Sequence, residues 1–344
     1  MVALGSAALF GMSTPFAKIL VGTVSPLMLA GLLYAGSGLG LTLVLVGRHL
    51  WIARESSISL PRRGEWFWLA GAIFFGGLVG PVALTYGLVR SAASTASLLL
   101  NLEAVFTALL AWFLFRENFD RRVLLGMSCI VAGGLALAWS PGGYGNAWPG
   151  LVLIALACLC WAIDNNLTRK VSASDALLIA ALKGLVAGAV NLGLGLLFGQ
   201  ALPRLGVLAL AMTVGFIGYG VSLVLFVLAL RDLGTARAGA YFSVAPFFGA
   251  ALALLLQGDA ITFQLAAAGL LMGAGVWLHL TEHHGHLHAH ERQEHTHAHW
   301  HDEHHRHSHD FAWDGHEPHT HPHLHLPLIH AHPHYPDLHH RHPH

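Results

Sequence analysis

The sequence predicts an all-α integral membrane protein of ten transmembrane helices, arranged as two inverted five-helix repeats and followed by a disordered histidine-rich tail. Hydrophobic residues make up 55% of the 344-residue chain and charged residues only 10%, whereas soluble proteins contain about 25% charged residues. A block of sequence occurs twice in the apolar part, and nearly all the histidines follow it. We therefore expect the lipid bilayer to be the solvent for residues 1–280.

Ten apolar stretches of about 18–25 residues are each long enough to cross the hydrocarbon core as a helix. They lie near residues 2–22, 27–47, 66–89, 91–115, 122–140, 148–166, 175–198, 205–230, 236–256 and 262–280. We expect them to form a first repeat over residues 1–140 and a second over residues 148–280. Residues 281–344 then form the tail.

The repeated block is the strongest evidence for two related halves. NLEAVFTALLAWFLFRE, Asn101–Glu117, aligns without a gap with SVAPFFGAALALLLQGD, Ser243–Asp259. Phe106, for example, falls on Phe248. Internal repetition in an apolar chain is typical of transporters that hold their binding site between two halves, near the middle of the membrane.

The basic residues predict how the chain is oriented. Eleven of them lie in the loops after the second, fourth, sixth and eighth spans: Arg48, Arg54, Arg62, Arg63, Arg116, Arg121, Arg122, Arg169, Lys170, Arg231 and Arg237. The opposite loops hold Arg90 and Arg204. Because positive charge concentrates on the cytoplasmic side, we expect a multi-pass protein of the cell (plasma or inner) membrane with both termini in the cytoplasm. Five spans in each half then turn the second half upside down. The basic residues are scattered between apolar segments, singly or in adjacent pairs, which excludes a nucleic-acid-binding patch.

Short motifs near the start of each half carry a family resemblance. They are an F-G…P…K pattern (Phe10, Gly11, Pro15 and Lys18) and its echo W-A…R (Trp161, Ala162 and Arg169). With the repeated blocks, they make residues 1–280 resemble the drug/metabolite transporter (DMT) superfamily, specifically its EamA-type members. The resemblance implies a fold of two five-helix units that moves a small molecule across the bilayer.

Two polar residues of the fourth span are candidates for the substrate site. Glu103 falls at the centre of the span, where a charge is costly and is a functional candidate for that reason. We interpret it as a carboxylate that contacts the substrate or carries a proton. The alternative is a protonated structural carboxyl that hydrogen-bonds a neighbouring helix. Asn101 lies on the opposite face of the same helix, and one of the two faces must line the interior or a cavity.

Two more ionisable residues fall within spans. Asp164, in the sixth span, is either a substrate contact or a hydrated group near the helix end that pairs with Arg169 or Lys170. Lys183, about two turns into the seventh span, either extends toward the cytoplasm or pairs with a buried acid or an anionic substrate.

Three tyrosines complete the predicted substrate site. Tyr86, Tyr219 and Tyr241 lie in the third, eighth and ninth spans, which the family resemblance places around a central cavity. The alternative is a structural role, because tyrosine is also common in the aromatic belts at the two membrane surfaces.

The tail predicts metal binding. Of the 27 histidines, all but His49 and His279 lie between His283 and His344, mostly spaced His-X-His and among few large aliphatic side chains. Such a composition predicts disorder, and its neutral imidazoles suit zinc, nickel or cobalt. The candidate ligands are His286, His288, His290, His295, His297, His299, His301, His305, His307, His309, His319, His321, His323 and His325. A solubilising tail and a proton sensor are the alternatives.

These observations predict a secondary-active transporter that exports a small polar metabolite by alternating access, with proton coupling through Glu103. One alternative makes the cargo nickel, cobalt or zinc, which the tail collects or senses; another is a membrane-anchored metal buffer. The metabolite is favoured because so few histidines lie outside the tail. No enzyme is predicted, since neither H-E-x-x-H nor G-x-S-x-G occurs in the spans. No cofactor is required, and a homodimer is left open.

Overall fold

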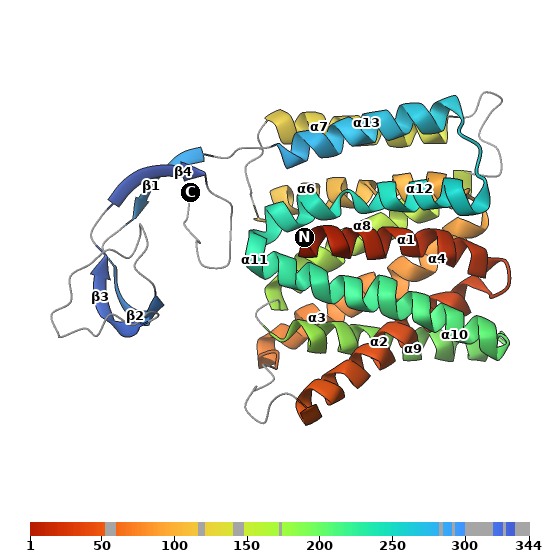
Figure 1. Cartoon of the computed structure of the whole chain (residues 1–344), viewed down its shortest axis with the longest axis horizontal. Helices are drawn as coiled ribbons and strands as arrows, with labels where there is room; N and C mark the ends of the chain where they lie inside the picture. The colour runs from red at the N-terminus through yellow and green to blue at the C-terminus, as the bar shows by residue number, and fades with distance from the viewer. Residues whose placement is uncertain are drawn as a thin grey trace. The chain divides into compact units, whose positions relative to one another are not determined.

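The computed structural model describes residues 1–51, 60–115, 121–139, 148–171, 174–281, 285–290, 293–299, 319–325 and 328–333. The chain divides into a helical unit that contains Met1–Glu282 and a second unit, His283–Tyr335. Figure 1 shows the helical unit as a bundle of long helices that run roughly side by side.

The helices of the first unit follow the apolar stretches of the sequence closely. In chain order they are α1 (Val2–Val21), α2 (Pro26–Trp51), η1 (Arg63–Glu65), α3 (Trp66–Ala72), η2 (Ile73–Val79), α4 (Gly80–Val89), α5 (Ala93–Leu99), α6 (Leu102–Phe115), α7 (Arg121–Ala138), α8 (Trp148–Val171), α9 (Ala176–Leu197), α10 (Leu205–Val214), η3 (Gly215–Val221), α11 (Ser222–Phe242), α12 (Ala245–Gln257) and α13 (Phe263–Leu280).

The surface of the unit is that of a membrane protein. Among the described residues, nine helical segments are long and apolar enough to cross a bilayer. Large apolar side chains such as Leu197 and Phe263 are more than 80% exposed, as expected where lipid rather than water covers the protein. The prediction of an all-α membrane body is therefore confirmed.

Two spans contain a π-helical segment at equivalent positions. Segment η2 joins α3 to α4, and η3 joins α10 to α11. The segments begin at Ile73 and Gly215, and this pair of positions has the same sequence offset as Asn101 and Ser243, where the repeated blocks begin. A π-helical turn contains one residue more than an α-helical turn and often marks a functional site.

A second interruption also occurs in both halves. Helix α5 ends at Leu99 and α6 begins at Leu102, while α11 ends at Phe242 and α12 begins at Ala245. The two breaks lie almost as far apart along the chain as the two repeated blocks do, within one residue, so they occur at equivalent places in the two halves.

The expected loop between the eighth and ninth spans is not a loop. Helix α11 continues without a break through residues 231–235. The expected ninth span, residues 236–256, is divided between the end of α11 and the 13-residue α12, which is shorter than the nine candidate spans. The charges of Arg231 and Asp232 lower the local hydropathy, but α11 contains no proline, so nothing in its sequence ends the helix.

Glycine allows two pairs of helices to pack closely at opposite edges of the bundle (Figure 1). Between α2 and α9, a Cβ atom on Gly184 would overlap the backbone of Gly38, and one on Gly188 would overlap that of Ala35. Between α7 and α13, Gly126 meets the carbonyl oxygen of Gly275 in the same way. Small residues at such contacts allow the close van der Waals packing that holds helices together in lipid.

The second unit contains four short strands where the composition predicted disorder. Strand β1 (Gly285–His290) pairs antiparallel with β4 (Leu328–Pro333), and β2 (Gln293–His299) pairs antiparallel with β3 (His319–His325). The expectation of disorder covered residues 281–344 and therefore included these segments. Their His-X-His spacing has the two-residue period of a strand, which the composition argument did not take into account.

Candidate functional site

A central cavity lies between helices of both halves. It encloses about 600 Å³ of space, part of which is open to solvent. The lining residues are Phe10, Tyr34, Ser37, Glu103, Trp161, Asp164, Asn165, Ala180, Lys183, Gly184, Gly218, Tyr219, Ser222, Leu223, Phe226 and Phe242. The wall is mainly aromatic and apolar, with a few polar groups, which is the usual composition of a small-molecule site.

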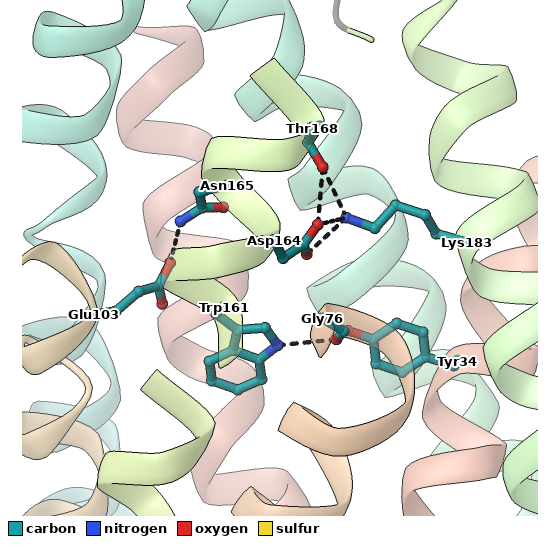
Figure 2. Close-up of polar contacts among 8 residues, drawn as sticks. All are labelled: Tyr34, Gly76, Glu103, Trp161, Asp164, Asn165, Thr168 and Lys183. Carbon is teal, nitrogen blue, oxygen red and sulfur yellow. Dashed lines mark hydrogen bonds and ion pairs between the residues drawn. The ribbon is translucent and has the colours of Figure 1, made fainter. Parts of the chain in front are cut away.

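A buried ion pair forms one side of the cavity. The Lys183 ammonium on α9 lies 2.6 Å from Oδ1 and 2.7 Å from Oδ2 of Asp164 on α8. Thr168, one turn after Asp164, donates to Oδ1 at 2.8 Å and accepts from Lys183 at 3.3 Å. Asp164 and Lys183 are 7% and 3% exposed, so each charge has little contact with solvent and depends on the other. Figure 2 shows the three side chains together.

The π-helical segment η2 supplies a backbone acceptor beside this pair. A π-helix would bond the carbonyl of Gly76 to the N–H five residues later, but that residue is Pro81 and has no N–H. Tyr34 Oη and Trp161 Nε1 donate to this carbonyl instead, at 2.6 and 3.1 Å (Figure 2). A Cβ on Gly76 would overlap the Asp164 carboxylate, so glycine is required for this arrangement.

Glu103 lies on the other side of α8 from the ion pair (Figure 2). Asn165 Nδ2 donates to Glu103 Oε1 at 2.8 Å. Glu103 is partly exposed, and it lines the cavity from the first turn of α6, just after the break between α5 and α6. In the described residues, Asn165 is the one hydrogen-bond partner of the Glu103 side chain, so the other carboxylate oxygen has no protein donor.

Aromatic rings form a continuous part of the wall. The Phe10 ring on α1 lies 5.7 Å from Trp161, 5.7 Å from Tyr219 and 5.3 Å from Phe242, measured between ring centroids. Tyr34 lies 5.5 Å from Tyr219. Edge and tilted contacts at these distances stabilise aromatic clusters.

The two halves contribute equivalent positions with different chemistry. A Cβ on Gly76 would overlap Asp164 of α8, and a Cβ on Gly218 would overlap Ser13 of α1. Gly76 and Gly218 have the same sequence offset as the two repeated blocks, and Ser13 follows Phe10 at the same interval as Asp164 follows Trp161. The charged group is present in one half and a hydroxyl takes its place in the other.

Hydrogen bonds join several helices at the end of the bundle where α1, α4 and α12 end. Lys18 Nζ donates to the carbonyl of Leu88 at 2.6 Å, and Gln257 Nε2 donates to that of Pro15 at 2.9 Å. The backbone N–H of Ser94, at the start of α5, donates to Asp259 at 2.8 Å. The bonds from Gln257 and Ser94 tie the two halves together at this end, and the bond from Lys18 joins α1 to α4 within the first half.

Four of the seven predicted substrate residues lie on the cavity: Glu103, Asp164, Lys183 and Tyr219. Asp164 is buried and paired with Lys183, not hydrated at a helix end.

The other three predicted residues lie away from the cavity wall. Asn101 is buried at the break between α5 and α6, where it donates to the Leu98 carbonyl at 3.0 Å. Tyr86 and Tyr241 are 41% and 38% exposed, and neither lines the cavity. The substrate-binding role of all seven residues stays a prediction.

Several residues that line the cavity were not predicted from the sequence. Tyr34, Asn165 and Phe242 carried no separate signal, because an aromatic or amide side chain in an apolar span has many structural uses. Phe10 and Trp161 belong to the paired motifs of the sequence. Phe10 precedes Ser13 by the same interval as Trp161 precedes Asp164, and this equivalence could have predicted that both rings line the cavity.

The predicted metal ligands of the tail divide into two groups. His301, His305, His307 and His309 lie outside the described residues. The others fall in the strands, where the backbone register sets His295 opposite His323, His297 opposite His321 and His299 opposite His319. In the described part of the helical unit, no group of three or more histidine, cysteine or acidic side chains is placed to hold a metal ion.

Comparisons with known proteins agree with the fold. An "uncharacterized transporter" of Methanothermobacter thermautotrophicus is 27% identical over 283 residues, 78% of this chain and 82% of its own length. A "probable amino-acid metabolite efflux pump" of Salmonella typhimurium is 30% identical over 206 residues, 55% of this chain and 67% of its own. A "probable 4-amino-4-deoxy-L-arabinose-phosphoundecaprenol flippase subunit ArnE" of Pseudomonas fluorescens is 36% identical over 88 residues, 26% of this chain and 75% of its own.

A solved crystal structure shares the fold. It matches 80% of this chain and 94% of its own length with a TM-score of 0.59 at 20% sequence identity. The model of the EamA-like transporter family matches residues 1–139 and again residues 148–281. The two matches together cover most of the chain, and the chain belongs to the EamA-like transporter family.

Proposed function

We propose that the protein is a secondary-active transporter that exports a small polar metabolite by alternating access, with Glu103 exchanging a proton. The observation that carries the proposal is the position of Glu103, whose second carboxylate oxygen has no protein donor in the described residues and which lines the cavity. A carboxyl group in this position can bind either a proton or a polar group of the cargo.

The arrangement of the bundle supports alternating access. The cavity is lined by helices of both halves, and hydrogen bonds from Gln257 and Ser94 join the halves at one end. The name of one relative refers to an amino-acid metabolite, which favours a small polar metabolite as cargo here. The distribution of the basic residues supports an orientation in the cell membrane with both termini in the cytoplasm.

Transport assays in proteoliposomes test the proposal. A pH gradient should drive accumulation or release of the cargo by the intact protein, and Glu103→Gln should abolish the dependence on the gradient. Glu65→Gln is a matched control, because Glu65 lies in η1, outside the cavity, and glutamine can replace it as acceptor from the backbone of Arg62. Equal pH dependence in the wild type and Glu103→Gln would contradict proton coupling through this residue.

A transition-metal cargo is the second candidate, and the histidines that face one another across β2 and β3 favour it. Zinc, nickel or cobalt would then be collected or sensed by the tail. Elemental mass spectrometry of cells that express the intact protein or Glu103→Gln distinguishes the candidates. A metal content that depends on Glu103 supports metal transport. A metal content that depends on the tail alone supports a metal buffer or sensor.

A further inference from the structure

The charged side chains that line the cavity differ in whether they are free to bind a cargo. Among the described lining residues, the ionisable acids and bases are Glu103, Asp164 and Lys183. Asp164 and Lys183 are already paired at 2.6 Å. The pair has no net charge, so an ionised Glu103 gives the cavity a net charge of −1.

Lys183 has no donor left for a cargo. An ammonium group has three N–H donors. The Lys183 ammonium contacts both oxygens of Asp164 and the hydroxyl of Thr168. An anionic group of a cargo would have to displace Asp164, which would leave a buried carboxylate without its cation.

Glu103, unlike Lys183, still has hydrogen-bonding positions that a cargo could use. A carboxylate has about four acceptor positions on its two oxygens. In the described residues Glu103 receives a single hydrogen bond, from Asn165 to Oε1. Its Oε2 atom is therefore an acceptor with space for an N–H donor from the cavity side.

The rings on the wall suit the same ligand chemistry. Phe10, Trp161 and Tyr219 form one aromatic cluster on the cavity that Glu103 also lines. Aromatic faces attract cations, and aromatic walls bury the apolar part of a ligand.

We propose that the cargo is an organic cation, a protonated amine on an apolar body, with its ammonium group at Glu103 Oε2 and its body against the Phe10, Trp161 and Tyr219 rings. The inference rests on the proposed transport function and narrows its substrate class. An amino-acid zwitterion would bring a carboxylate for which the described lining residues offer no free cation, and such a group is costly to bury.

Two sets of compounds that differ only in charge test this. The first is tryptamine, tryptophan and indole-3-propionate, and the second is phenethylamine, phenylalanine and 3-phenylpropionate. Each is loaded into proteoliposomes containing the full chain, and its release and its competition for binding are measured. We expect the amine of each set to be bound and moved preferentially, and Glu103→Gln to weaken amine binding by about tenfold or more. Glu65→Gln should leave both readouts unchanged.

The outcomes separate the two proposals. Preference for the zwitterion or the anion in either set overturns the organic-cation inference and leaves the transport function in place. Amine binding that Glu103→Gln does not weaken also overturns the inference. If no compound of either set binds or moves, the organic-cation inference fails, while the proposed metabolite transport is decided separately by the pH-gradient assay.

Discussion

Lys183 and Asp164 form a buried ion pair in which each charge neutralises the other. Both side chains are buried, and each is the main charged partner of the other. Removing one member of a buried pair costs more than replacing both, because the remaining charge has no counter-ion. The pair is therefore a stringent test of the local geometry.

We expect Lys183→Met to lower the free energy of unfolding by about 3–5 kcal/mol. Adding Asp164→Asn should recover a large part of this loss, because the uncompensated carboxylate is then removed. Thermal unfolding of the purified protein in detergent, for both single variants and the double variant, measures the coupling. Strictly additive losses would show that the two side chains do not depend on each other.

Gly76 gives a second prediction for a single residue. Its missing side chain leaves room for the Asp164 carboxylate. We expect Gly76→Ala to displace Asp164 and to destabilise the protein by about 1–3 kcal/mol. Gly206→Ala in α10 is the control, since no atom lies within 4 Å of its added Cβ. A stability loss of the same size in both variants would contradict the proposed overlap.

At the scale of single elements, the start of α9 is fixed by a charged cap. Asp175 Oδ1 accepts from the backbone N–H groups of Leu177 and Leu178, and Oδ2 lies 2.6 Å from Arg48. Burial alone would raise the pKa of Asp175, but the hydrogen bonds and the charge of Arg48 outweigh it, so the pKa is lowered. Because the folded pKa is lowered, the carboxylate stabilises the protein above its unfolded pKa of about 3.9. This stabilisation is lost as the pH falls through the folded value.

We therefore expect Asp175→Asn to cost about 1 kcal/mol at neutral pH and to make no difference in strong acid. Unfolding measured from pH 7 down to the acid limit of the fold tests this. Thr262→Ala is the matched control: Thr262 caps α13 by accepting from Leu265 N–H at 3.1 Å and does not titrate. Its cost should be independent of pH. A pH-independent difference for Asp175→Asn would contradict the role of the charge.

The contact between α2 and α9 depends on glycine. A leucine at Gly184 would meet the backbone of Gly38, and we expect the two helices to separate, with a loss of several kcal/mol. Gly193→Leu, in the same helix, should be tolerated, because a Cβ there meets no atom within 4 Å. Unfolding in detergent and the yield of folded protein measure both variants. Equal behaviour would show that this contact is not close-packed.

The positions of the membrane spans could be predicted from the sequence, but the breaks within them could not. The apolar runs locate the spans, since hydropathy reports burial in lipid directly. The break after Leu99 and the continuation of α11 through Arg231 were not predictable, because both depend on local backbone hydrogen bonds that hydropathy does not report. Asp164 and Lys183 were recognised as unusual residues. Their pairing depends on how two helices are rotated against each other, which one sequence does not contain.

At the scale of the whole molecule, the division into a helical unit and the unit His283–Tyr335 predicts separable functions. Truncation after Leu280 should abolish retention on a nickel resin and leave transport of the cargo unchanged. Resin binding and proteoliposome transport of the truncated and full-length proteins measure this. Loss of transport in a truncated protein that unfolds at the same temperature would show that the tail takes part in the transport cycle.

The ion pair that occurs in only one half has a thermodynamic consequence. If two identical inverted halves exchanged conformations during alternating access, the inward-open and outward-open states would be related by a two-fold rotation about an axis in the membrane plane and would have equal free energy. Asp164 occupies in one half the position that Ser13 occupies in the other, so the exchange does not reproduce the starting state. If the protein works by alternating access as proposed, we therefore expect it to have a preferred resting side when unloaded, which its own sequence fixes before any ion gradient acts.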